Sequence, residues 1–175
     1  MDALTNDGSM DAGDLEARAA DLVNPASGIA NDYLNHFNEV LLLIENLPVM
    51  LPEMVDEILG WTPISYREYF QKSRLPGSAK ALQIYDSLDA DFRAYFEREI
   101  EGLNRLALES IDVIKHHRAE DGSIDPDAVS DYCERASATM RKSLEHTADI
   151  VNNGRKAVVE AAQSMADRLL VAPAA

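Results

Sequence analysis

Cysteine is almost absent from this sequence, since Cys133 is the only one among 175 residues. A single thiol cannot form an intramolecular disulfide, and it cannot supply the several cysteines of a structural zinc site. The histidines also lack the spacing of two metal motifs, because neither His-Glu-x-x-His nor the Glu-x-x-His of di-iron bundles occurs. We therefore expect no metal, no cofactor and a reducing, cytoplasmic environment.

Long apolar runs are missing as well. The longest one, VLLLI at residues 40–44, is far shorter than the roughly 20 apolar residues that a membrane-spanning helix needs. The N-terminal sequence is acidic, and it lacks the basic and apolar regions of a secretion signal. We expect a soluble protein that is neither inserted into a membrane nor exported.

Positive charge is scarce, because 16 basic residues stand against 31 acidic ones and the formal net charge is −15. Such a charge repels the phosphates of nucleic acids and of anionic lipid surfaces at long range. We therefore expect a protein partner, of unknown identity, and neither nucleic acid nor membrane. Residues 1–24 are acidic and interrupted by glycine, which predicts a mobile N-terminal tail.

Strand-like alternation is also missing, and apolar residues recur instead at steps of three and four, the period of helices. Helix starts are indicated by Pro52, by the capping box of Ser65 with Glu68, and by the cap residues Asp89 and Asp125. The sequence thus predicts an all-α helical bundle, with long first, central and C-terminal helices and short helices in between, in a domain over residues 25–150. The long helices are expected over 26–47, 90–117 and 127–170, and the short ones begin near residues 52, 65 and 78.

The last predicted helix is longer than the bundle requires. At 1.5 Å per residue it would span about 65 Å, whereas the first helix reaches only about 30 Å. Either the helix breaks at 152–154 or it overhangs, and an overhanging apolar stripe needs a partner, of which a second copy of the chain is the simplest. Residues 151–175 are therefore predicted to continue the helix as a self-association segment. The expected contact residues are Val151, Gly154, Val158, Ala162, Met165 and Leu169.

His36 lies at the edge of the apolar face of the first helix, with Asp32 about one turn before it and Glu39 after it. A carboxylate can orient a working imidazole, so His36 is a possible phosphoacceptor of a histidine phosphotransfer protein. A phosphohistidine requires positive charge nearby, but no Lys or Arg occurs between Arg18 and Arg67. We therefore favour the interpretation that His36 is a half-buried residue that completes a helix interface.

Segment 61–88 carries a net positive charge, with four basic residues against two acidic ones, and it is rich in aromatic residues. A helix begins near Ser78 with basic residues on either side, and the free N–H groups of a helix N-terminus can bind a phosphate or a carboxylate. The alternative is that the aromatic rings belong to the core and the bases pair with neighbouring acidic helices. The residues predicted to bind a partner or an anion are Arg67, Lys72, Arg74, Gly77, Ser78 and Lys80.

No nucleophile with a suitable base stands out, because the serines occupy helix caps or helix faces. Our leading hypothesis is a non-enzymatic, cytoplasmic interaction or regulatory protein. It would associate with itself through the last helix and present the acidic first helix, or the basic segment, to a protein partner. Two alternatives stay open, namely histidine phosphotransfer through His36 and binding of a small anionic ligand by the 61–88 segment.

Overall fold

The computed structural model describes residues 22–49 and 52–171. Within these ranges the chain forms seven α-helices and no strand, which confirms the predicted all-α bundle. None of the described helices is long and apolar enough to cross a membrane. Most of the predicted mobile tail, residues 1–21, lies outside the described residues.

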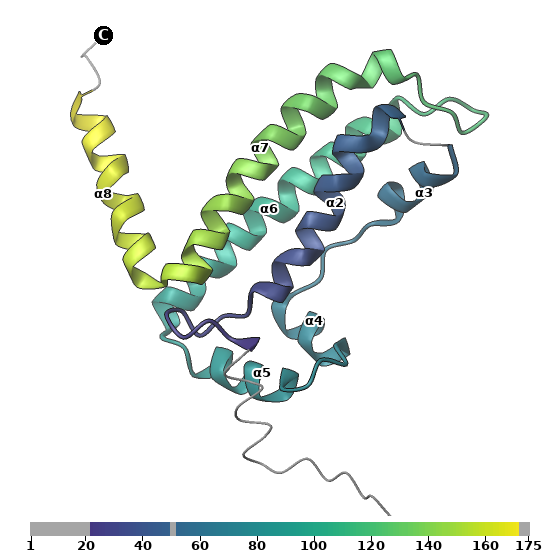
Figure 1. Ribbon diagram of the computed structural model, residues 1–175. Coiled ribbons are helices and arrows are strands. Elements are labelled where there is room, and N and C mark those ends of the chain that lie inside the picture. The colour runs from purple at the N-terminus through teal and green to yellow at the C-terminus, as the bar shows by residue number, and fades with distance from the viewer. Residues whose placement is uncertain (1–21, 50–51, 172–175) are drawn as a thin grey trace, which may run out of the picture.

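Three helices form the body of the molecule: α2 (Asn35–Asn46), α6 (Ala90–His116) and α7 (Pro126–Asn153). Helices α2 and α6 run in the same direction, and α7 runs antiparallel to both (Figure 1). Apolar residues at steps of three and four place one face of each helix in a shared core, where a fully buried side chain contributes about 1.5–3 kcal/mol. Fully or almost fully buried members of this core include Phe37, Leu41, Ile44, Phe96, Leu103, Ile114 and Met140.

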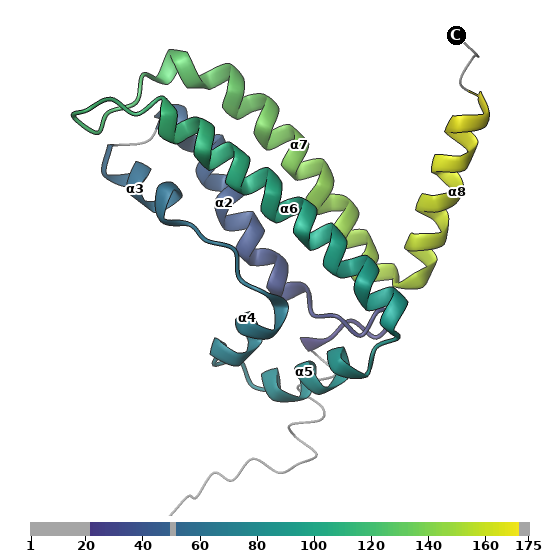
Figure 2. The same cartoon turned by 180° about the vertical axis from the view of Figure 1, so that it is seen from behind.

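The short helices α3 (Pro52–Gly60), α4 (Tyr66–Lys72) and α5 (Ser78–Ser87) cover the outside of α2 and α6 at two ends (Figure 2). Helix α3 lies near the loop that follows α6, and Arg118 of that loop pairs with Asp56 at 2.8 Å. Helices α4 and α5 close the opposite end. The Ser65 hydroxyl accepts a hydrogen bond from the Glu68 N–H, as the predicted capping box requires.

The first helix begins later than expected, because residues 23–30 form a turn and the 3₁₀ turn η1 (Asn31–Leu34) precedes α2. Gly28 has a φ of +72°, which glycine adopts without strain. A residue in this conformation interrupts a right-handed helix, so the predicted helix cannot start at residue 26. The side chain of Val23 is buried and belongs to the core. The folded domain therefore includes residues 22–24, which the expected boundary at residue 24 had assigned to the tail.

The last helix breaks at Gly154, between α7 and α8 (Arg155–Val171). Gly154 has φ +58° and ψ −137°, and a Cβ atom there would lie 2.3 Å from the Ala26 carbonyl oxygen. Only glycine fits this position. The break between residues 152 and 154, one of the two outcomes expected from the sequence, is thus present. However, α8 does not fold back along the bundle but diverges from α7 in both views (Figures 1 and 2).

Candidate functional site

His36 lies on α2 with its ring stacked on Trp61, at a centroid distance of 4.6 Å and an interplanar angle of 20°. Trp61 donates its indole N–H to the His36 carbonyl oxygen at 3.3 Å. The Nε2 atom of His36 is buried and has no hydrogen-bond partner among residues 22–49 and 52–171. Burial lowers the pKa of the imidazole, against the opposing effect of Glu39. This packing suits the interface role, and an enclosed Nε2 weighs against attack on a phosphodonor.

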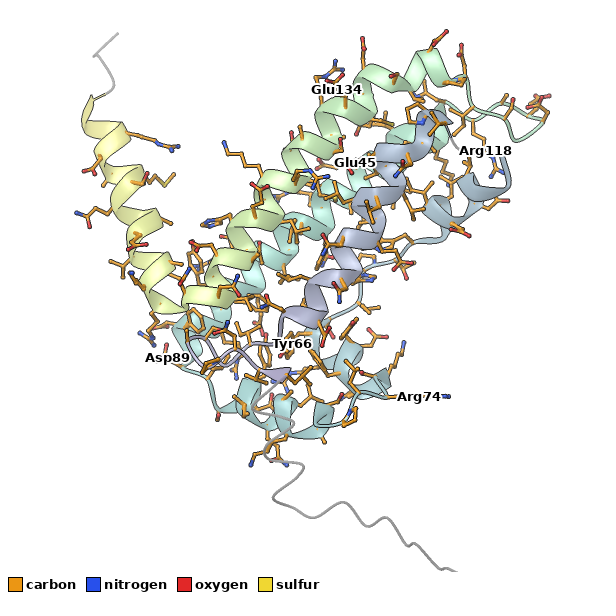
Figure 3. The ribbon with its side chains drawn as sticks, viewed as in Figure 1. Glu45, Tyr66, Arg74, Asp89, Arg118 and Glu134 are labelled. Atoms are coloured by element: carbon orange, nitrogen blue, oxygen red, sulfur yellow. The ribbon has the colours of Figure 1, made fainter. Side chains whose placement is uncertain are left out.

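The basic residues of segment 61–88 point to different places rather than converging on one site. Arg67 pairs with Asp86, and Lys72 pairs with Glu68 on the same helix at 2.7 Å. Arg74 projects into solvent at the end of the molecule away from α3 (Figure 3). Two of the predicted cations are therefore already balanced by carboxylates, as the alternative interpretation of this segment expected.

The start of α5 offers less to an anion than the sequence predicts. Gly77 is the N-cap residue, with a φ of +91°. Ser78 is buried, and its hydroxyl donates to the Leu75 carbonyl oxygen at 2.7 Å. Its backbone N–H donates to the same carbonyl oxygen at 3.2 Å. Lys80 lies half-buried on the first turn of α5. Both donors of Ser78 are thus used within the chain, which weighs against its predicted role as an anion ligand.

Helix α8 is a 17-residue arm that leaves the bundle at Gly154. Met165 is 68% exposed and Ala162 is also exposed, whereas Val158 is half-buried. These three residues, Val158, Ala162 and Met165, form what we call the arm stripe. The side chain of Leu169, which was also predicted as a contact residue, is not among the side chains that the structure describes.

Two residues predicted for self-association are engaged within their own chain. Val151 is fully buried in the bundle core, and Gly154 lies directly against the Ala26 carbonyl. A second chain could reach either position only by opening the bundle. The structure therefore restricts the exposed part of the predicted self-association surface to the arm stripe.

A groove of about 580 Å³ separates the arm stripe from the bundle. Its opposite wall consists of Tyr95 and Glu99 of α6 and His146 of α7. The His146 Nε2 atom lies 3.5 Å from the Tyr95 hydroxyl and 3.8 Å from a Glu99 carboxylate oxygen. The groove thus combines a mainly apolar side on α8, where Ser164 and Arg168 are the polar members, with a polar side on the bundle.

Contacts at the base of α8 hold this groove in shape. Arg155, the first residue of α8, pairs at 2.5 Å with Asp89, the N-cap residue of α6 (Figure 3). The Ser27 hydroxyl donates to the Val151 carbonyl oxygen at 2.5 Å. The Asn152 side chain accepts from Asn31 at 3.0 Å. The N-terminal turn and α6 therefore fix the direction in which α8 leaves the bundle.

Comparisons of this chain with protein-family models, with curated proteins and with solved structures give no match. The site must therefore be interpreted from its own geometry. Sequence reasoning missed Asp89, Ser27 and Tyr95, because each acts through a contact with a residue more than fifty positions away. A cap signal was visible at Asp89, but nothing in the sequence connects that residue with Arg155.

Proposed function

We propose that this chain is a non-enzymatic, cytoplasmic interaction protein that associates with a second copy of itself through α8. The observation that carries the proposal is the arm stripe, an apolar face on a helix that diverges from its own bundle. Exposed apolar faces of this kind are typical of interaction sites. Binding, rather than a reaction, is the function proposed.

The isolation of α8 supports this proposal on energetic grounds. A short isolated α-helix has little stability of its own in water, because most helical stability in proteins comes from tertiary packing of an apolar face. Helix α8 has 17 residues and is in contact with α7 mainly at their shared corner. A partner that packs on the arm stripe would supply the missing stabilisation.

A second copy is the occupant that the shape of the groove favours. One wall of the groove is α8 itself, so two chains related by a twofold axis can each place α8 in the groove of the other. The small side chains of Ala161 and Ala162 lie on the groove wall and allow two helix backbones to approach closely. This arrangement is closed, since each arm covers the stripe of its partner.

The serine hydroxyls are consistent with binding rather than catalysis. Ser78, Ser110 and Ser137 each donate to a backbone carbonyl oxygen of their own helix or of the turn before it. Cys133 is buried, which raises the pKa of its thiol and disfavours the reactive thiolate. These potential nucleophiles are engaged in structural contacts.

The test is the oligomeric state of the full chain at micromolar concentration, measured by sedimentation velocity. Replacing Val158 and Met165 together by glutamate should weaken self-association at least about tenfold, since burying an unpaired ion costs several kcal/mol. The matched control is Val159→Glu, which adds a charge to the same helix at a position 62% exposed and outside the groove lining. This control should remain associated.

A wild-type chain that sediments as a monomer throughout this range would refute self-association. Equal weakening by Val159→Glu would place the contact on another face of α8 and would contradict the assignment to the arm stripe.

A further inference from the structure

A second cavity, of about 380 Å³, lies between the loop before α4 and the first half of α6. Its size falls within the range of small-ligand sites. The walls are aromatic and apolar, because Tyr66, Tyr85 and Phe96 are buried side chains that line it, together with Ile100. The cavity is separate from α8 and its groove, so its function goes beyond the self-association proposed above.

The charged lining of this cavity is mainly acidic. Glu97 and Glu101 lie one turn apart on α6, and both are exposed lining residues. Like charges at this spacing repel each other. Glu97 accepts a hydrogen bond from the Tyr85 hydroxyl at 2.9 Å and lies 4.0 Å from the Arg93 guanidinium on the same helix. No ion-pair partner is present for Glu101 in the part of the chain that the structure describes, so Glu101 carries the unbalanced negative charge. A cation between the two carboxylates would relieve this repulsion.

Arg67 does not reverse the charge of the cavity, although it also lines it. Its guanidinium pairs with Asp86 and lies 5.7 Å from the centroid of the Tyr85 ring. The basic group is therefore already balanced by a carboxylate and an aromatic face. Its position shows that this end of the protein accommodates a guanidinium among tyrosine rings and acids.

Asn104 lines the cavity and carries an unpaired acceptor. Its Oδ1 atom is buried and has no hydrogen-bond partner within 22–49 and 52–171. A buried acceptor without a donor destabilises the free protein, so a ligand N–H that reaches it improves binding. The tyrosine hydroxyls stay protonated, since burial raises the pKa of Tyr66 to about 12. The available groups therefore favour a ligand that donates hydrogen bonds and carries positive charge.

We propose that this cavity binds a small organic cation, an ammonium or guanidinium group on an apolar body. Glu97 and Glu101 hold the charge, Asn104 accepts an N–H, and the body lies between the aromatic walls. The sequence left a small anionic ligand open as an alternative for segment 61–88, whereas the cavity, which several residues of that segment line, favours a cation.

The first test compares three probes of similar shape by calorimetric titration of the full chain near neutral pH. The probes are 2-phenylethylamine, which is a cation, 2-phenylethanol, which is neutral, and phenylacetate, which is an anion. The amine should bind at least about tenfold more tightly than the alcohol, because a charge-assisted hydrogen bond exceeds a neutral one by this amount or more. Equal or tighter binding of phenylacetate would overturn the proposal, as would the absence of amine binding at millimolar concentration.

The second test asks whether the Glu101 carboxylate binds the cationic group of the ligand. Glu101→Gln should weaken binding of 2-phenylethylamine about tenfold, because it removes one carboxylate while keeping the shape of the side chain. The control Glu109→Gln makes the same change at an exposed position of α6 outside the cavity and should leave the affinity unchanged. Equal affinities of Glu101→Gln and wild type would refute the assigned site.

A further probe distinguishes a free amine from a side chain of a protein, since both carry the same ammonium chemistry. N-acetyl-lysine amide should bind more weakly than 2-phenylethylamine, whose ring matches the aromatic walls. Tighter binding of the lysine derivative would overturn the assignment to a small molecule and transfer the site to a basic peptide.

Discussion

At the scale of single residues, His36 shows how burial makes a titratable group sensitive to pH. Its ring packs on Trp61, and desolvation lowers the pKa of the imidazole below its ordinary value of 6.5. The charge of Glu39 and the backbone of Thr62 raise the pKa, but each has a smaller effect than burial. The folded state therefore prefers neutral His36 more strongly than the unfolded state does.

This preference predicts that acidification lowers stability. Because the pKa of His36 is lower in the folded protein, the unfolded chain takes up the proton first, and stability is lost as the pH falls through about 6.5. His36→Gln should reduce the loss of unfolding free energy between about pH 7.5 and about pH 5.5. At the higher pH the variant should itself be about 1 kcal/mol less stable, through lost packing. Urea denaturation at both pH values measures the difference.

The control for this prediction is His116→Gln, because the His116 side chain is 73% exposed at the end of α6. This variant should keep the pH dependence of the wild-type protein. An unchanged pH dependence in His36→Gln would show that another group dominates this range.

At the scale of elements, the helix starts were predictable because their causes are local. The Ser65 cap of α4, the Asp89 cap of α6 and proline at the start of α7 each act within a few residues. The direction of α8 was not predictable, since it depends on contacts of Gly154 and Val151 with a turn more than a hundred residues earlier. The candidate site follows the same division: the apolar stripe was visible, but the opposite wall of its groove was not.

Gly154 is the element-scale determinant that can be tested directly. Gly154→Ala combines a strained positive φ with a Cβ atom 2.3 Å from the Ala26 oxygen. We expect it to destabilise the chain by about 3 kcal/mol or more, as measured by urea denaturation. The control is Gly102→Ala within α6, where a Cβ atom meets nothing within 4 Å. That change should stabilise the protein by up to about 1 kcal/mol. An equally stable Gly154→Ala variant would mean that α7 and α8 form one continuous helix in solution.

At the scale of the whole molecule, charge opposes the self-association that the arm stripe favours. Each chain carries a formal net charge of −15, so two copies repel each other at long range. Helix α8 is an exception, because Arg155, Lys156 and Arg168 stand against Glu160 and Asp167, which leaves 3 − 2 = +1. An arm of this charge is attracted weakly, rather than repelled, when it approaches an acidic bundle.

The balance of these two effects predicts how salt acts on the dimer. The repulsion involves the full charge of both chains, whereas the attraction involves a single excess positive charge on each arm, so the repulsion is the larger effect. Raising sodium chloride from about 0.05 M to about 0.5 M shortens the screening length from more than 10 Å to less than 8 Å. Self-association should therefore strengthen severalfold, as measured by sedimentation at both salt concentrations. The chain with glutamate at both 158 and 165 should stay monomeric in each. Weaker association at high salt would instead show that ion pairs between the arm and the partner's bundle dominate the interface, and that the apolar stripe is secondary.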